Sequence, residues 1–522
     1  MRAMLRSLTF AAFVLAATLI VPAPVQALPI EFLPVRHAAY DEIETLVAEG
    51  LLDSLNIYTR PLARVDVAAA LLRARRRDAA IARNLHYQRL ERELARELTD
   101  LGAPPERAES RLLLDTGQGA QRARVSLAAH LLGDYDPDRE GAEFRLRDES
   151  SVTARGSVQL SPAFGAYEEF GVTRIRSQRE FIDAIALHSD LEMSLMRAEI
   201  TARTGPVGFA AGYDQFRWGP GRRGTLLLSD AAGPITFFQY GGSFGGRVTA
   251  TAFSGVVSKA DGRYLAAHRV EALVTPRLSI GLAEAVRYSA DGIDLLYGMG
   301  LIPYTLIERI HIRDASNDSI RYLQRSNVMA SLDAVARVSR ALSLYGELLI
   351  DDMATEDEGM PDRLGYQLGL RSDRPFGAHT AHILAEYSRV RRFTYATYYG
   401  ENFIHKDRPV GFVLGPDVET VWMEVGFDLS RDWQARWTGE FTDQGEGYLG
   451  EAWTPDLGPV SNVGLYGVVQ ERREFWGDLR WMPRDQFDVS AGLGYRRIAN
   501  VNHEEGATQT GWLARMALEV RY

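Results

Sequence analysis

The chain of 522 residues contains no cysteine and almost no lysine. The absence of cysteine excludes disulfide bonds, thiolate metal sites and cysteine nucleophiles. Lys259 and Lys406 are the only lysines, so arginine supplies nearly all of the positive charge. A GC-rich genome accounts for such a bias. Guanidinium groups also suit the carboxylate and phosphate groups of acidic glycans and lipid headgroups, because they form paired hydrogen bonds with them.

Beyond its N-terminus the sequence also lacks long apolar runs. No stretch after residue 27 offers the roughly 18 uncharged apolar residues that a membrane-spanning helix needs. Any insertion of the mature chain into a membrane must therefore use strands. The net charge of −10 and the mean hydropathy of −0.18 fit an ordinary soluble protein, so a membrane location has to be argued from pattern. The acidic balance disfavours nucleic acid as a partner.

The first 27 residues have the three parts of a secretion signal. Arg2 and Arg6 form a positive n-region, residues 8–21 form an apolar core, and Val25-Gln26-Ala27 supplies small residues for cleavage. We therefore expect residues 1–27 to be a cleaved signal peptide. The mature chain would then have 522 − 27 = 495 residues and a charge of −10 − 2 = −12, because the signal holds two arginines and no acid.

Residues 28–110 are poor in glycine, contain no tryptophan and follow a helical period. We expect three helices there: one from about residue 40 that ends at Gly50, one that opens after Pro61, and one over about 82–101. The apolar stripes are Tyr40, Ile43, Leu46 and Val47 in the first helix, Val67, Leu71 and Ala74 in the second, and Leu90, Leu94 and Leu98 in the third. This segment is predicted to be a small α-helical bundle or plug.

Residues 111–522 change to a strict alternation of apolar and polar residues. Phe487, Val489, Ala491, Leu493 and Tyr495 alternate with charged and small residues, and residues 512–522 repeat the pattern. A soluble β-sandwich also alternates, but here the segments run about ten residues, recur over 412 residues and place aromatics at their ends. The pattern predicts an all-β, antiparallel transmembrane β-barrel. At roughly 20–25 residues per strand, the length allows about 16 to 20 strands.

Three stretches stand out: YDEIETLVAEGLLDSLNIYTRPLARVDVAAALL at residues 40–72, GYDQFRWGPGRRGTLLLSDAAGPI at 212–235, and EYSRVRRFTYATYYGENFIHKDRPVGFVLGPD at 386–417. They resemble the capsule-assembly Wzi family of outer-membrane proteins. The most specific part is Arg217-Trp218-Gly219-Pro220-Gly221. The resemblance implies an 18-stranded barrel in the outer membrane with its periplasmic end closed by the helical segment. It also implies a surface lectin that holds capsular polysaccharide, without catalysis.

The first candidate ligand-binding site surrounds the turn at residues 219–221. Arg217, Arg222 and Arg223 could present guanidinium groups to an anionic glycan or a lipopolysaccharide phosphate, with Trp218 beside them. The alternative is that Trp218 packs in the interior and the arginines pair with carboxylates of the barrel wall.

The second candidate site is the aromatic stretch around residues 393–405. Tyr395, Tyr398 and Tyr399 offer flat rings for the apolar faces of sugars, and Asn402 and His405 offer polar groups for their edges. Packing within a loop, or an aromatic girdle at the membrane interface, is the alternative.

Signals of catalysis are weak. The string Gly241-Gly242-Ser243-Phe244-Gly245 matches a nucleophile elbow, but the text after it alternates like a strand, whereas the elbow must lead into a helix. No metal site and no cofactor are expected, and the acidic group at Asp314, Asn317 and Asp318 is interpreted as a solvated turn. We expect a monomeric, non-enzymatic protein that attaches or assembles capsular or other acidic polysaccharide among outer-membrane lipid and lipopolysaccharide. A porin-like or substrate-selective channel is the alternative, and a hydrolase built around a histidine such as His311 or His382 is a more distant one.

Overall fold

The computed structural model describes most of the chain. The described residues are 31–52, 55–104, 113–118, 121–137, 144–147, 150–161, 163–174, 185–188, 191–314, 326–353, 359–376, 379–484 and 486–521. The expected signal peptide and the final Tyr522 lie outside these ranges. Among the described helices, none combines the length and the apolar character needed to cross a bilayer.

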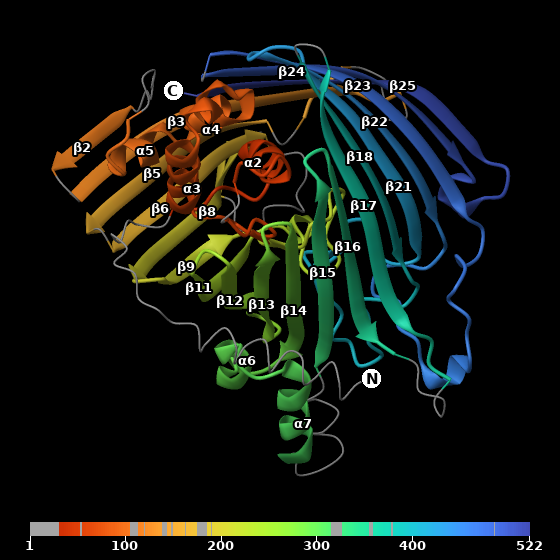
Figure 1. Ribbon diagram of the computed structural model, residues 1–522. Coiled ribbons are helices and arrows are strands. Elements are labelled where there is room, and N and C mark those ends of the chain that lie inside the picture. The colour runs from red at the N-terminus through yellow and green to blue at the C-terminus, as the bar shows by residue number, and fades with distance from the viewer. Residues whose placement is uncertain are drawn as a thin grey trace.

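Eighteen long antiparallel strands form a closed barrel within the described residues (Figure 1). In chain order they are β3 (Gln121–Tyr135), β5 (Ser151–Ser161), β6 (Phe164–Arg174), β8 (Leu191–Thr204), β9 (Val207–Asp214), β11 (Ile235–Phe244), β12 (Val248–Ser258), β13 (Arg263–Thr275), β14 (Leu278–Ser289), β15 (Asn327–Ser339), β16 (Leu342–Asp352), β17 (Arg363–Phe376), β18 (His379–Val390), β21 (Val418–Asp428), β22 (Trp433–Gln444), β23 (Gln470–Arg484), β24 (Phe487–Ala499) and β25 (Thr508–Arg521). Pairing of β25 with β3, from Ala514↔Tyr135 to Arg521↔Ala128, closes the ring. The short strands β2 (Leu114–Gln118), β4 (Arg145–Leu146) and β7 (Ile185–His188) add to its edges. The predicted barrel is confirmed.

The alternation of the sequence separates an apolar outer face from a charged interior. On β25, Trp512 and Met516 face outward and are 70% and 48% exposed, whereas Arg515 between them faces inward and forms an ion pair with Asp478 at 2.5 Å. Aromatic pairs lie on the outer face toward both ends of the strands: Trp433 with Trp481 and Tyr495 with Trp512. Such girdles are typical of the two interfaces of a membrane.

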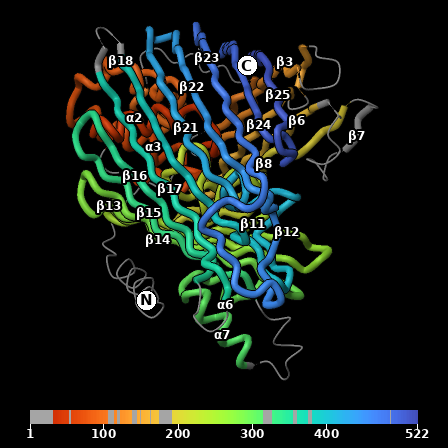
Figure 2. The backbone as a smooth tube through the Cα atoms, turned by 90° about the vertical axis from the view of Figure 1, so that its right-hand side faces the viewer, coloured from red at the N-terminus to blue at the C-terminus, as the bar shows by residue number. Residues whose placement is uncertain are grey.

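The two ends of the barrel differ in their connections. At one end, called here the turn end, strands are joined by short turns such as residues 245–247 between β11 and β12 and residues 429–432 between β21 and β22. At the opposite end, called the loop end, most connections are long, for example residues 290–326, 391–417 and 445–469. Figure 2 shows the N-terminal helices α2 and α3 toward one end of the barrel and the later helices α6 and α7 beyond the other.

Helices near the N-terminus fill the turn end. They are α2 (Ala39–Ala48), α3 (Arg64–Arg77), the 3₁₀-helix η1 (Ala79–Arg83), α4 (Leu85–Glu93) and α5 (Ala95–Asp100). Their apolar stripes share one buried core that includes Ile43, Leu46, Val67, Leu71 and Leu90. The described residues 31–104 are called the plug below. The stop of the first helix at Gly50 is confirmed, with φ +75 at that glycine.

The third helix differs from the expectation because it is divided. Asn84 caps α4 by accepting hydrogen bonds from the backbone N–H groups of His86 and Tyr87. Leu94 then leaves the helical conformation between α4 and α5. Arg64 of α3 donates a hydrogen bond to the carbonyl oxygen of Glu93 at 2.7 Å, a tertiary contact at the break that helical periodicity cannot show.

Ion pairs connect the plug to the barrel wall on several sides. Asp66 of α3 accepts two hydrogen bonds from Arg203 of β8, at 2.9 and 2.7 Å. Glu44 of α2 pairs with Arg371 of β17 at 3.1 Å. Further pairs join Asp100 to Arg122, Glu93 to Arg521, and Asp41 to Arg436. Ion pairs therefore hold the plug in the lumen, because the side chains that the alternating strands direct inward are polar.

Two long connections from the loop end fold into the lumen. Residues 215–234, which contain β10 (Arg217–Trp218) and η2 (Asp230–Ala232), and residues 391–417, which contain β19 (Ile404–His405) and β20 (Arg408–Pro409), are called the inner loops. β10 pairs with β1 (Thr59–Arg60) of the plug, with Thr59 opposite Trp218. One apolar core joins the plug, both inner loops and the wall: Phe32 and Val65; Phe216, Trp218 and Leu227; Phe403 and Phe412; Ala267 and Leu349.

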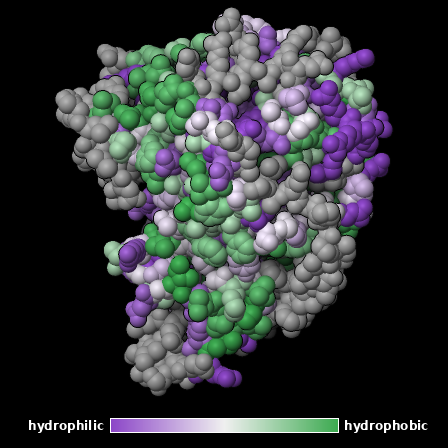
Figure 3. Space-filling model, turned by 90° about the vertical axis from the view of Figure 1, so that its left-hand side faces the viewer, coloured by the Kyte–Doolittle hydropathy of each residue, from purple (hydrophilic) through white to green (hydrophobic). Residues whose placement is uncertain are grey.

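Two helices, α6 (Leu295–Met299) and α7 (Tyr304–Asp314), pack on the outer side of the barrel. Side chains of β13 and β14 that point away from the lumen meet them in a buried cluster of Tyr264, Val286, Tyr288, Tyr297 and Tyr304. The carboxylate of Glu284 accepts the backbone N–H of Tyr304, at the start of α7, at 2.9 Å. On the other faces of these helices, Leu295 of α6 is 81% exposed and Ile310 of α7 is 43% exposed. Figure 3 shows one face of the molecule, on which hydrophobic residues form several patches between hydrophilic ones.

Candidate functional site

The turn at residues 219–221, with Arg217 and Trp218 before it, lies in the lumen against the plug. Trp218 is buried, 1% exposed, and its ring lies edge-on to Phe253 of the wall, 5.6 Å between centroids. Its backbone N–H donates to the carbonyl oxygen of Leu228 at 2.9 Å. The Arg217 guanidinium donates to the carbonyl oxygens of Gly221 and Arg222 and so closes the turn on itself.

The other two arginines of this turn meet carboxylates. Arg222 donates to Asp41 of the plug at 2.5 Å, and Arg223 donates to both oxygens of Glu440 on β22, at 3.0 and 3.3 Å. Glu386 of β18 accepts the backbone N–H groups of both Arg222 and Arg223. The turn is thereby held between the plug and two strands. Its charges are balanced within the protein, as charges in a protected interior usually are.

Tyr395 and His405 lie inside the second inner loop and hold it in place. Tyr395 is 0% exposed; its hydroxyl donates to the carbonyl oxygen of Leu226 at 2.6 Å and accepts the backbone N–H of Phe412 at 3.0 Å. The tyrosine thus ties the two inner loops together. His405 donates from Nε2 to the carbonyl oxygen of Pro234 at 3.2 Å, and burial lowers the pKa of its imidazole to about 4.

Tyr398 and Tyr399 are placed differently, because they reach the surface of the same loop. Tyr398 is 45% exposed and its ring lies edge-on to Tyr399, with centroids 5.2 Å apart. The Tyr399 hydroxyl donates to the carbonyl oxygen of Ser326 at 3.0 Å. Asn402 lies beside them, and its side-chain oxygen accepts the backbone N–H of Thr397 at 3.0 Å. Of the nine candidate residues, Tyr398 presents the most open aromatic face.

A neighbouring loop adds aromatics that the sequence did not single out. Tyr448 and Tyr466, both in the connection of residues 445–469, are 65% and 48% exposed. Arg392 of the inner loop stacks over the Tyr466 ring at 3.4 Å and pairs with Glu451 of that connection. A Cβ added at Gly450 would lie 3.3 Å from the amide nitrogen of Asn402, so the two loops touch. Tyr448 stands among glycine and acidic residues and Tyr466 lies between Leu465 and Gly467, and no local pattern marks either of them.

The lumen is filled rather than open along the inner loops. The apolar core that joins the plug to the wall through residues 215–234 and 391–417 includes Trp218, Leu226, Phe403 and Phe412, each at most 1% exposed. A cavity of about 560 Å³ remains between the plug and the wall, lined by Arg60 and Arg73 on the plug side and by Arg203, Gly208 and Gly241 on the wall side. Trp218 lies at its border.

A further group of polar side chains lies where the plug meets β18 and β21. His86, His382 and Asp428 bring one possible ligand atom each to within 4.8 Å of the others. They stand apart from both inner-loop candidates in the sequence, and each comes from a different element.

A closed barrel of eighteen strands with an apolar, aromatic-banded outer face and a helical plug defines an integral outer-membrane protein. The model of the family named capsule assembly protein Wzi matches residues 133–512. The chain belongs to that family. The resemblance noted in the sequence is confirmed, and with it the outer-membrane location and a role in capsule assembly.

Several solved structures are similar to the chain to different degrees. Wzi of Escherichia coli, described as an outer-membrane protein involved in group 1 capsule assembly and as a carbohydrate-binding β-barrel, is similar with a TM-score of 0.63 at 12% identity, over 94% of this chain and 99% of that chain. OprD of Pseudomonas aeruginosa matches with a TM-score of 0.43 at 10% identity, over 77% of this chain and 94% of its own. A loop-deletion mutant of OmpT of Vibrio cholerae matches with a TM-score of 0.36 at 8% identity, over 77% of this chain and 100% of that chain. No curated protein sequence matches the chain significantly.

Proposed function

We propose that this protein holds capsular or a similar acidic polysaccharide at the cell surface without catalysing a reaction on it. The observation that carries the proposal is the surface of two touching loops, residues 391–417 and 445–469, on a barrel whose lumen is filled. Tyr398, Tyr448 and Tyr466 are 45%, 65% and 48% exposed there. These three residues are called the tyrosine surface.

The orientation in the membrane supports an external position for this surface. Bacterial outer-membrane barrels have short periplasmic turns and longer extracellular loops. By that rule the turn end, with the plug, faces the periplasm, and the loop end faces outward. The tyrosine surface then lies on the outside of the cell, where polysaccharide is retained.

The chemistry of the surface suits sugar rings. An exposed aromatic face packs against the apolar C–H face of a pyranose, and amide and charged groups beside it bind the hydroxyl groups at its edge. Tyr399 and Asn402 border Tyr398, and Arg392 stacks on Tyr466. The six other candidates divide by role: Tyr395 and His405 position the loop, while Arg217, Trp218, Arg222 and Arg223 fix its neighbour against plug and wall. Lipopolysaccharide surrounds the monomeric barrel and contacts its outer face.

The test compares cell-bound with shed polysaccharide. Deleting the gene in the organism that carries it should lower the cell-bound fraction and raise the shed fraction. Restoring the gene with Tyr398→Ala, Tyr448→Ala and Tyr466→Ala combined should reproduce most of that loss, while the three Tyr→Phe changes should retain attachment because the ring face remains. Leu457→Ala is the matched control, since Leu457 is 49% exposed in the same connection but offers no ring. Unchanged retention after deletion would end the proposal.

A porin-like role is favoured by one observation, the cavity of about 560 Å³ between plug and wall. A solute path would have to continue from it past Trp218, which the inner-loop core surrounds. Planar-bilayer conductance of the purified protein separates the two functions. Steady conductance with unchanged polysaccharide retention in the deletion strain would favour the channel.

A further inference from the structure

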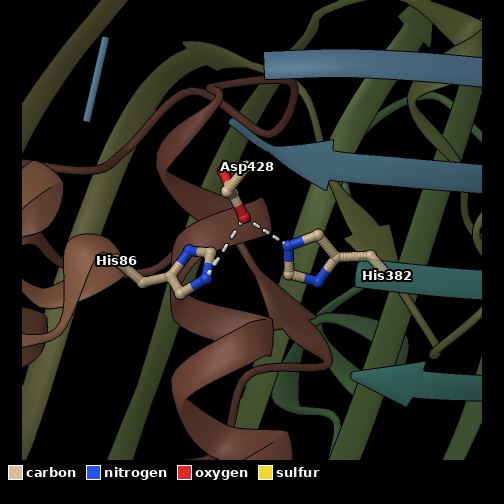
Figure 4. A group of neighbouring side chains, drawn as sticks. All are labelled: His86, His382 and Asp428. Atoms are coloured by element: carbon tan, nitrogen blue, oxygen red, sulfur yellow. Dashed lines mark hydrogen bonds and ion pairs between the residues drawn. The ribbon is translucent and has the colours of Figure 1, made fainter. Parts of the chain in front are cut away.

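Three side chains from distant parts of the sequence converge where the plug meets the barrel wall. His86 is the second residue of α4, His382 lies on β18, and Asp428 is the last residue of β21 (Figure 4). Nε2 of His382 contacts Oδ2 of Asp428, and Nε2 of His86 lies 3.5 Å from the same oxygen. His86 and Asp428 are 3% and 1% exposed, so the group is largely shielded from solvent.

A carboxylate holds the far side of each imidazole ring. Nδ1 of His86 hydrogen-bonds to Oε2 of Glu42 on α2, and Nδ1 of His382 hydrogen-bonds to Oδ1 of Asp373 on β17, both at 2.5 Å. In a neutral imidazole whose Nδ1 donates to a carboxylate, Nε2 carries the lone pair. Both Nε2 atoms face Asp428, and Nε2 of His382, which contacts Oδ2 of Asp428, must release its proton when it binds a metal ion. Such carboxylate–histidine pairs are the usual outer hydrogen bonds of histidines that bind metal ions, because they fix the ring and raise its basicity.

Hydrogen bonds also hold the carboxylate of Asp428 on the side that faces away from the two histidines. Oδ1 of Asp428 accepts hydrogen bonds from Arg89 at 2.6 Å and from Gln434 at 2.8 Å. Oδ2 is the oxygen that faces both histidines. Nε2 of His86 is buried and makes no hydrogen bond within the described part of the chain. A buried polar atom left unsatisfied costs about 1–3 kcal/mol, so its position beside two further ligand atoms calls for a bound partner.

We propose that His86, His382 and Asp428 bind a divalent transition-metal ion, with zinc as the best match. Two imidazole nitrogens and one carboxylate oxygen form a common zinc ligand set, completed by water. Two ligand atoms bonded to one zinc ion at about 2.0–2.1 Å lie about 3.3 Å apart in a tetrahedron. The 3.5 Å from His86 to Asp428 and the overall limit of 4.8 Å need only small side-chain adjustments to reach that geometry. A cavity of about 40 Å³ lined by all three residues has room for the water ligand.

The position of the ion gives it a structural role. One ligand belongs to the plug and two belong to the wall, so the ion would fasten the plug at the turn end in addition to the buried ion pairs around it. The charge balance permits this, because Glu42, Asp373 and Asp428 supply three negative charges against Arg89 and Arg371. The sequence alone predicts no metal site, since the ligands come from three elements with no ligand motif. This inference does not depend on the proposed polysaccharide attachment.

The test uses the full-length barrel, purified in detergent, stripped with a chelator and titrated with Zn²⁺ alone. We expect one tightly bound zinc ion per chain, at least tenfold weaker binding in His86→Gln and His382→Gln, and no change in His503→Gln. His503 is the matched control because it lies at the loop end, in the connection between β24 and β25. Co²⁺ substituted in the wild type should give the visible absorption of a four-coordinate site. Heat-modifiable mobility in gels shows that each variant still forms the barrel.

Two results would overturn the inference. One is the absence of stoichiometric Zn²⁺ binding by the wild type, in which case the group is a hydrogen-bonded network that holds a proton. The other is wild-type affinity in folded His86→Gln and His382→Gln together, which would place the ion elsewhere. If a variant fails to fold, X-ray absorption of the zinc-loaded wild type decides the question. Two imidazoles and oxygen ligands support the site, and any other ligand set rejects it.

Discussion

His405 shows at the scale of one residue how burial converts a candidate ligand-binding group into a structural one. Its pKa is lowered to about 4, first by desolvation and then by Lys406 and Arg287 nearby. When the loop opens, the imidazole regains an ordinary pKa near 6.5. Between pH 6.5 and about 4 the imidazole is therefore protonated in the open loop but neutral in the closed loop. The contribution of His405 to the free energy that favours the closed loop is therefore fully present above pH 6.5. It decreases by up to roughly 3 kcal/mol as the pH falls from 6.5 to about 4.

Hydrogen exchange of residues 391–417 at pH 7.5 and pH 4.5, corrected for intrinsic exchange rates, measures this effect. We expect protection to fall at the lower pH in the wild type and in His503→Gln. In His405→Gln the pH step should be absent, because the amide does not titrate. Equal protection at both pH values in the wild type would contradict the assignment of the effect to His405.

The same loop shows what the sequence could and could not predict about the site. Its aromatic composition singled out a segment that does place one ring, that of Tyr398, at the surface. Composition could not separate Tyr398 from Tyr395, three residues earlier, whose φ of 76° and interior hydrogen bonds depend on contacts with Leu226 and Phe412. Tyr448 and Tyr466 belong with Tyr398 only through the contact between two loops. Burial and loop contact are tertiary properties, so they had to come from the structure.

At the scale of the element, alternation predicted the strands well because side chains of a strand point alternately to lipid and lumen. Helical periodicity predicted α2 and α3 equally well. It missed α7, whose 11 residues sit inside a long connection, and it joined α4 to α5 across the break at Leu94. Both failures occur where a contact with the barrel or with another helix decides the local conformation.

The docking of α7 on the barrel gives a prediction at this scale. Glu284 of β14 accepts the first backbone N–H of α7 and lies 3.2 Å from Nε2 of His268. Glu284→Ala removes the capping acceptor, which is worth about 1–2 kcal/mol at a helix N-terminus. We expect faster proteolytic cleavage within residues 291–314 in this variant, and a smaller increase in Glu284→Gln, which keeps an acceptor.

The matched control for this change is Glu471→Ala. Glu471 lies on β23, distant from α7 along the barrel, and its side chain is 52% exposed. Its cleavage pattern should equal that of the wild type. Cleavage of Glu284→Ala at the wild-type rate would show that the apolar cluster around Tyr297 holds α7 without the cap.

For the whole molecule, length alone bounded the strand number and the family resemblance specified it, as eighteen strands confirm. The closing pair β25–β3 joins the two ends of the barrel sequence, which no local pattern can indicate. The sequence also could not show that two connections fold inward to meet the plug. That meeting turns a barrel wide enough for a channel into one whose lumen is filled.

The filled lumen predicts that the wild-type protein conducts poorly and that loosening the plug changes this. Arg203 and Arg371 pair with Asp66 and Glu44 across the plug–wall boundary. Arg203→Ala with Arg371→Ala removes both of these links between plug and wall, while Glu44 keeps its ion pair with Arg60 and the Asp66 side chain, 41% exposed, becomes hydrated. In planar bilayers we expect rare, brief openings of the wild type and at least a tenfold higher open probability of the double variant.

Arg472→Ala should behave as wild type, because Arg472 pairs with Glu474 of its own strand. Large, steady wild-type currents would mean that the plug does not seal the barrel. A silent double variant would mean that the apolar core around Trp218 seals it without these ion pairs.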